Sequence, residues 1–424
     1  MPGVDGGLAV VIARVDLSLV TAWLVLVVVG IVMVSSATAS QPEGSGYYLA
    51  RHGVYVLGSL VVLASLACVP LRVWEVMHVP CLVLAVVLCA LVLVPGVSQE
   101  INGSRRWVEL GLIRFQPAEA AKFLVVVYLA GCVARAGDAL STHWQLLLKP
   151  VALVVVVLVL ILYQPDFGSV VLLALLTGGI LFIGGARLRD FLLLAVLGGV
   201  AMAAVAVVEP YRVERLMTFT DPWATPYGTG YQLTQALIAF GSGGFFGLGI
   251  GEGVQKLLYL PFPHNDFIYA VIAEELGMVG AVAVLALLVA LTVRICRIGR
   301  DAVAERRVFA GMVAYGAALL LGMQTVFNVG VNTGVLPTKG LTLPFVSFGG
   351  NSLLVCSGLV ALALRVNYER RRPVVKPRRE PAPELAAEST ATSDGNYSAS
   401  ASASTFDSSD NSSPRTRSRA DALA

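Results

Sequence analysis

The sequence has little charge, and its few cysteines follow no metal-binding or redox pattern. Charged residues make up 13% of the 424 residues, whereas 57% are hydrophobic and the mean hydropathy is +0.79. A soluble domain of this length needs more polar surface, so the composition excludes a soluble protein. The six cysteines form no CxxC pair and have no histidine at metal-ligand spacing, which indicates small buried side chains.

Two further signals are missing. The first apolar run has no small-residue cleavage site after it, so we expect it to remain as a helix. The stretch from Gly241 to Gly253 holds seven glycines in thirteen residues but lacks the GK[ST] ending of a nucleotide-binding P-loop. Close approach of this backbone to a substrate or to another loop accounts better for the glycines.

Ten apolar runs are long enough to cross a bilayer core of roughly 30 Å. They cover 17–37, 48–69, 79–95, 118–135, 146–163, 168–185, 190–208, 267–293, 308–330 and 350–366. Backbone polar groups in lipid need internal partners, and these runs lack the alternation of barrel strands. We therefore predict an all-α polytopic membrane protein with about ten transmembrane helices and a large extracytoplasmic loop between helices 7 and 8.

The distribution of Lys and Arg predicts the orientation of the chain. The loops on the side of the termini hold most of the arginines, so we expect both termini to be cytoplasmic. The chain then divides into a cytoplasmic N-terminal segment (1–16), a membrane domain (17–368) containing the outer loop (209–266), and a tail (369–424). The tail has too few apolar residues to offset its ordering entropy and is predicted to be disordered and cytoplasmic.

Several cations fall on the outer side, against this bias, and favour binding of an anion there. They are Arg105, Arg106, Arg114, Arg212, Arg215, Lys256 and Lys339. The alternative is that they pair with acids of their own loops, such as Glu109, Glu214 and Glu252.

The outer loop before the fourth apolar run places Arg105, Arg106 and Trp107 in succession, followed by Pro117, Glu119 and Lys122. Arginine binds phosphate in a bidentate manner, and tryptophan suits a membrane interface or a sugar face. Lys122 lies one turn inside the next helix, where a cation is costly without a purpose; the alternative is an ion pair with Glu119.

Three other segments carry polar residues at membrane boundaries. Asp166 in Gln164-Pro-Asp-Phe-Gly is interpreted mainly as a helix cap. Asp266 stands where a polar loop enters the eighth apolar run, and a carboxylate kept at such a boundary is a candidate for function. Glu274 and Glu275 cannot both share its face of the helix, so at least one is expected to be structural.

The loop from Gly334 to Ser352 contains Pro337, Pro344 and a Gly349-Gly350 pair, which forbid a continuous helix. Lys339 in this loop is expected to share the outer space with Arg105 and Arg106.

These segments resemble the SEDS family of peptidoglycan polymerases, and the form of the last one is similar to the cell-division branch of that family. The motifs that carry the resemblance are GSRRW with QPAEAAK, QPDFG, YQLTQALIAFGSGGFFGLGIGEGVQKLLYLP, HNDFIYAVIAEELG and PTKGLTLPFVSFGGNS, within residues 15 to 368. The chain departs from the family pattern at Phe262, Asn265, Phe348 and Asn351, which concerns the polarity of the pocket.

The resemblance implies polymerisation of lipid II outside the cytoplasmic membrane, at the division septum, with a class B penicillin-binding protein and other division proteins as partners. It implies that Asp266 is the catalytic residue and that Arg105, Arg106, Trp107, Lys122, Lys339 and His264 bind the substrate. No nucleic acid is expected.

A single carboxylate is sufficient for the glycosyl transfer that the resemblance implies. Asp266 would take the proton of the acceptor hydroxyl, and the cations would stabilise the departing undecaprenyl diphosphate. A divalent cation, Mg²⁺ or Mn²⁺, could share that task, although the sequence offers no dedicated ligand set. Two alternatives stay open, namely a lipid II flippase and a non-catalytic scaffold that recruits division proteins.

Overall fold

The computed structural model describes residues 16–101, 104–110, 113–208, 219–257, 259–338 and 340–371, all within one compact unit, Met1–Pro373. The predictions for the N-terminal segment and for almost all of the tail therefore lie outside the described residues.

The described helices are α2 (Leu17–Ala37), α3 (Gly44–Cys68), α4 (Leu71–Val76), α5 (His78–Leu91), α6 (Pro117–Ala136), η1 (Gly137–Ser141), α7 (Gln145–Leu162), α8 (Phe167–Ile183), α9 (Leu188–Val208), η2 (Pro222–Ala224), α11 (Tyr231–Gly243), α12 (Ile268–Ala304), α13 (Val308–Asn332) and α14 (Gly350–Arg370). Each of the ten predicted apolar runs lies on one of these helices. Seven described spans are long and apolar enough to cross a membrane, and α5 and α8 are shorter apolar helices. The helical membrane architecture is confirmed for the bundle, while the number of crossings and the large extracytoplasmic loop stay predictions.

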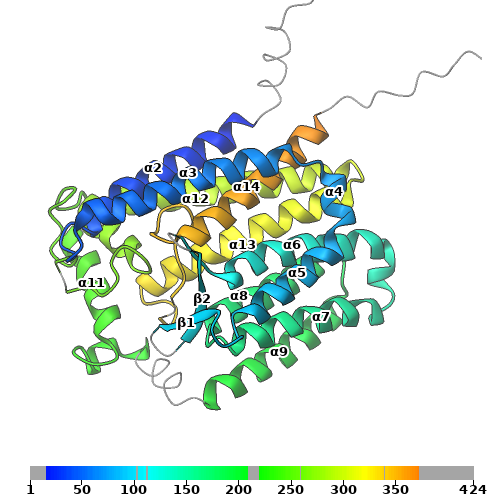
Figure 1. Ribbon diagram of the computed structural model, residues 1–424, viewed down its shortest axis with the longest axis horizontal. Coiled ribbons are helices and arrows are strands. Elements are labelled where there is room, and N and C mark those ends of the chain that lie inside the picture. Colours follow the sequence, from blue (N-terminus) through cyan, green and yellow to red (C-terminus); the bar gives the residue numbers. More distant parts are fainter. Residues whose placement is uncertain are drawn as a thin grey trace, which may run out of the picture. The chain divides into compact units, whose positions relative to one another are not determined.

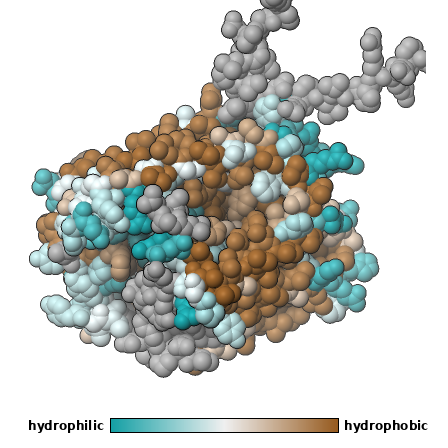
Figure 2. Space-filling view, in the orientation of Figure 1, coloured by the Kyte–Doolittle hydropathy of each residue, from teal (hydrophilic) through white to brown (hydrophobic). Residues whose placement is uncertain are grey.

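The long helices run side by side along one direction of the unit (Figure 1). The most apolar window of α14 is 83% buried and that of α13 is 72% buried, against 17% for α3, so α13 and α14 form the centre of the bundle. The space-filling view shows hydrophobic residues over the flanks of the helices and hydrophilic ones gathered toward the two ends, as expected for a bundle surrounded by lipid (Figure 2).

Helix α2 runs antiparallel to α12 and α14, and this defines two ends of the bundle. Asp16, before α2, bonds to Arg294 late in α12 and to Asn367 late in α14. Ser36, at the other end of α2, bonds to Glu275 near the start of α12. Asp266 therefore belongs to the end opposite Asp16.

A small antiparallel sheet occupies the loop between α5 and α6. Its strands are β1 (Ser98–Ile101), β2 (Ser104–Leu110) and β3 (Ile113–Phe115), in the order β1-β2-β3. Val108 pairs with Ser98 on one side and with Phe115 on the other. The sequence reading did not anticipate this sheet, which fixes the direction in which each side chain of β2 points.

Candidate active site

Asp266 lies directly before α12, and its side chain is partly exposed. The positive end of the α12 dipole favours a carboxylate at this position. The Asp266 carboxylate is so close to Gly340 that a Cβ added to that glycine would lie 3.1 Å from Oδ2. The sequence motif that contains Lys339 therefore does pack against Asp266, although Lys339 itself lies outside the described residues.

Two asparagines of α13 hold the backbone of Asp266 in place. The side-chain amides of Asn328 and Asn332 donate to the Asp266 carbonyl at 3.0 and 2.9 Å. Asn332 Oδ1 accepts from the Ala270 N–H at 3.1 Å and so supplies a cap that α12 lacks locally, while Asn328 also donates to the Leu341 carbonyl at 2.6 Å. Both amides are almost fully buried, and Asn328 joins the Asp266 segment to the 333–349 loop.

Sequence reasoning missed these asparagines. The available signal was two amides four residues apart in an apolar spanning segment, where polar side chains are costly and generally have a purpose.

His264 fastens the same segment from the other side. Its carbonyl accepts from the Phe348 N–H at 2.8 Å, and its buried ring contacts the rings of Tyr48 and Phe348, with centroids 4.9 and 5.5 Å away. Burial lowers the pKa of His264 to about 4, against a weak opposite effect of Glu43, so the imidazole is neutral near pH 7.

The turn between α7 and α8 lies next to this loop. Leu341 is within 3.6 Å of the Cβ position of Gly168. Asp166 caps α8 through the Ser169 N–H at 3.2 Å and the Ser169 hydroxyl at 2.8 Å, so the interpretation as a helix cap is confirmed.

Arg106 attaches the sheet to that turn. Its Nε donates to the Gln164 carbonyl at 3.0 Å and its Nη2 to the Pro165 carbonyl at 2.5 Å. Because strand side chains alternate, Arg105 and Trp107 point away from the face that carries Arg106 and the buried Val108. Arg105 is exposed. The two neighbouring guanidiniums therefore do not face the same way.

Lys122 is fully buried and bonds to Glu119 at 2.6 Å, one turn earlier on α6. The ion pair that the sequence left open as an alternative is therefore present. Glu119 Oε2 is buried with no hydrogen-bond partner among the described residues.

Among the other cations that the sequence predicts to be on the outer side, Arg114 pairs with Glu109 at 3.1 Å. Arg212 and Arg215 lie outside the described residues.

The glycine-rich segment after α11 forms backbone hydrogen bonds to α12 on both sides of a break in that helix. Gly277 has a φ of +70°, which interrupts the helix. The N–H groups of Leu248 and Gly249 donate to the carbonyls of Glu274 and Glu275 at 3.0 Å each, while Met278 and Val279 donate to Gly244 and Phe245. A Cβ on Gly277 would lie 2.3 Å from the Gly247 nitrogen, so the glycines allow backbone to meet backbone. The sequence predicted that this backbone would closely approach a substrate or another loop, and in the structure it closely approaches helix α12.

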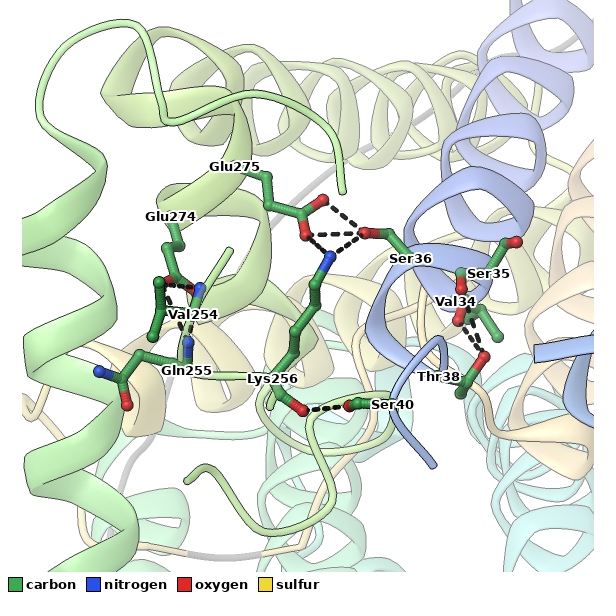
Figure 3. Close-up of polar contacts among 10 residues, drawn as sticks. All are labelled: Val34, Ser35, Ser36, Thr38, Ser40, Val254, Gln255, Lys256, Glu274 and Glu275. Atoms are coloured by element: carbon green, nitrogen blue, oxygen red, sulfur yellow. Dashed lines mark hydrogen bonds and ion pairs between the residues drawn. The ribbon is translucent and has the colours of Figure 1, made fainter. Parts of the chain in front are cut away.

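Both glutamates that follow Asp266 hold this segment to α12 (Figure 3). Glu274 Oε1 accepts from the N–H groups of Val254 and Gln255 at 2.8 and 3.1 Å. Glu275 lies 2.6 Å from Lys256 Nζ, and Ser36 of α2 bonds to both, at 2.7 Å to the carboxylate and 2.8 Å to the ammonium. Lys256 is 1% exposed, so the expectation that it attracts an external anion is wrong. Its partner is Glu275 on the adjoining helix.

The described residues hold no cluster of three His, Cys, Asp or Glu side chains that could bind a metal. A metal centre held by three such side chains therefore does not fit that part of the chain.

Comparison with known proteins places the chain in a family. A family model described as a cell cycle protein (FtsW, RodA and SpoVE) matches residues 16–372. A probable peptidoglycan glycosyltransferase FtsW of Nitrosococcus halophilus is 48% identical over 364 residues, which is 85% of this chain and 94% of that protein. The protein of the same name from Saccharophagus degradans is 44% identical over 367 residues, again covering 85% and 94%.

Solved structures agree with the sequence relatives. A chain from a structure titled for the coordination of polymerization and crosslinking by a peptidoglycan synthase complex matches with a TM-score of 0.70 and 31% identity, covering 85% of this chain and 99% of that one. The Thermus thermophilus rod shape determining protein RodA matches with a TM-score of 0.60 and 30% identity, covering 85% and 98%. The chain is therefore an integral membrane protein that belongs to the FtsW/RodA/SpoVE family of cell cycle proteins.

Proposed function

We propose that this protein is a peptidoglycan glycosyltransferase that joins lipid II units into glycan strands, with Asp266 as the general base. The observation that carries the proposal is the position of Asp266. Its carboxylate is partly exposed at the start of α12, while two buried asparagines hold its backbone and the 333–349 loop packs against its side chain. A base must be held in place and still be reachable by its substrate.

One carboxylate suffices for this reaction. The acceptor 4-hydroxyl of GlcNAc attacks C1 of MurNAc with inversion and transfers its proton to Asp266. The bond between C1 and the diphosphate oxygen breaks, and undecaprenyl diphosphate leaves with the electron pair. A glycosidase needs a second carboxyl group to protonate its leaving alkoxide, but a diphosphate is already a good leaving group once cations stabilise it.

We assign stabilisation of the diphosphate to Arg105, Arg106, Lys122 and Lys339. Their existing contacts indicate that they do not all contribute in the same way. Arg106 bonds two backbone carbonyls and Lys122 bonds Glu119. These contacts give Arg106 and Lys122 mainly a positioning role. Trp107, which shares the Arg105 face, is proposed to contact the sugars, whereas His264, whose ring is buried against Tyr48 and Phe348, is proposed to act on substrate binding by holding the Asp266 segment in place. Mg²⁺ or Mn²⁺ bound to the diphosphate would add positive charge at the leaving group.

The family also supports a proposal for the setting of the reaction. We propose a role at the division septum in the cytoplasmic membrane, with both termini cytoplasmic, Asp266 extracytoplasmic, and a class B penicillin-binding protein and further division proteins as partners. The relatives that are named FtsW support division, and the matching chain of a peptidoglycan synthase complex supports a crosslinking partner.

The test is polymerisation of purified lipid II, with and without the proposed partner, followed by gel separation of the glycan products. Asp266→Asn and Asp266→Ala should give no polymer while inserting normally. Glu109→Gln is the matched control, because it removes a carboxylate charge from the neighbouring sheet, where Glu109 already pairs with Arg114. It should retain activity.

A ladder of glycan products from Asp266→Ala would refute the assignment. If Asp266→Asn instead abolished lipid II movement across liposomes and left polymerisation intact, the protein would be a flippase. Full function of Asp266→Ala in cells, together with loss of function on deletion of residues 380–424, would indicate a scaffold.

A further inference from the structure

A groove of about 440 Å³ lies between α2 and α12 at the end of the bundle opposite Asp266. Its apolar lining comes from Ala22, Val25, Leu287, Ala290, Leu291 and Val293, and its polar lining from Ser18, Thr21, Arg294 and Arg297. On α2 these residues recur every three or four positions, so they form one continuous face.

The apolar part of the groove opens outward. Val25 is 48% exposed and Val293 is 41% exposed, and both helices are among the spans long and apolar enough to cross a membrane. The surroundings of such a face are lipid acyl chains. The groove thus offers a concave apolar surface to hydrocarbon.

At the polar end of the groove, one positive charge has no partner among the described residues. Arg294 donates twice to Asp16 Oδ2, at 2.9 and 2.7 Å, and Ser18 donates to Asp16 Oδ1 at 2.6 Å, so this guanidinium is neutralised. Arg297, one turn further along α12, is exposed and makes no hydrogen bond or ion pair within the described part of the chain. Its charge can be matched by an anion at the mouth of the groove.

We propose that this groove binds an anionic glycerophospholipid, with an acyl chain along the apolar lining and the head-group phosphate on Arg297. The combination of a lipid-facing apolar trough with an unmatched guanidinium at one end fits an amphiphile with one negative charge. This end of the bundle is the one that we propose to be cytoplasmic, where anionic lipids attract juxtamembrane cations. The inference does not depend on the proposed glycosyl transfer.

The experiment is native mass spectrometry of the full-length protein, purified in detergent and depleted of lipid, then titrated with dioleoyl phosphatidylglycerol or dioleoyl phosphatidylcholine. The wild type should retain the phosphatidylglycerol more tightly. Arg297→Gln should lower its affinity for phosphatidylglycerol about fivefold and leave phosphatidylcholine unchanged. Arg300→Gln is the matched control, because Arg300 is on the same helix, is 73% exposed and lies outside the groove beside Asp301.

A second variant tests the apolar lining. Ala290 is exposed in the groove, so Ala290→Phe should fill it without disturbing the core and should weaken binding of both lipids. Equal affinity of the wild type for the two lipids, or equal losses in Arg297→Gln and Arg300→Gln, would overturn the proposal. It would also be overturned if Ala290→Phe left the binding of both lipids unchanged, because the groove would then not be their site.

Discussion

Replacing Lys256 by methionine should destabilise the protein by about 3–5 kcal/mol, since it leaves the Glu275 carboxylate buried without its counter-charge. The pair is 2.6 Å apart with side chains 2% and 0% exposed, and Ser36 is the remaining hydrogen-bond donor to the carboxylate. Glu275→Gln should cost a similar amount, because it leaves the ammonium buried with the Ser36 hydroxyl and a neutral amide.

The double variant Lys256→Met/Glu275→Gln should lose less than either single variant. Neither a charge nor an unpaired carboxylate is then left inside, and the glutamine amide can still bond to Ser36. Reversible unfolding in mixed detergent gives the four free energies of unfolding needed for a double-mutant cycle.

The exposed pair of Arg114 and Glu109 is the matched control. Its atoms are 3.1 Å apart with side chains 48% and 35% exposed, so its coupling free energy should be below about 1 kcal/mol. Losses that simply add in the Lys256 and Glu275 cycle, or a coupling no larger than that of the control pair, would refute the reasoning.

The remaining predictions concern the neighbourhood of Asp266 and the break in α12. Asn332→Ala should lower kcat of polymerisation about tenfold to a hundredfold with a smaller effect on KM, since it loosens the backbone that places Asp266; a change confined to KM would contradict the positioning role. Burial lowers the pKa of His264 from 6.5 to about 4, so between these values the unfolded chain binds a proton that the folded chain does not. Stability should therefore fall by about 2 kcal/mol from pH 7 to pH 5, and His264→Gln should remove that fall in unfolding measurements; an unchanged pH dependence in the variant would count against it. Gly277→Ala should abolish folded protein on size exclusion, because its φ is +70° and the added Cβ meets backbone, whereas Gly198→Ala, in open space on α9, should be tolerated; equal yields would show that the break accepts a side chain.

The helices could be predicted because apolar length alone decides where a chain can cross a bilayer. The run at 17–37 coincides with α2, and Asp166 was interpreted as the cap that it is. The boundary at Asp266 could be predicted for the same reason, because the sequence changes there from a polar loop to an apolar run.

Contacts between segments distant in sequence could not be predicted in the same way. Lys256 was interpreted as an outer cation because its partner, Glu275, lies on a helix whose rotation is set by packing. The strand β2 was interpreted as a loop because it is only seven residues long and rich in polar side chains. Its formation depends on hydrogen bonding to two neighbouring strands, β1 and β3. The position of Arg106 on the face opposite Arg105 follows only from that pairing.

The backbone hydrogen bonds between the glycine-rich segment and α12 also limit where residues can be inserted into the chain. Four backbone hydrogen bonds fix the number of residues between Gly244 and Gly249 to the spacing of carbonyls and amides across the break, so an inserted residue would shift every donor off its acceptor. The stretch around Tyr227, which is 94% exposed, makes local turn bonds such as those from the N–H groups of Gly228 and Gly230 to the Thr225 carbonyl, and these do not depend on alignment with another helix. An epitope tag or a fluorophore for this end of the bundle therefore belongs beside Tyr227, several residues before α11 begins.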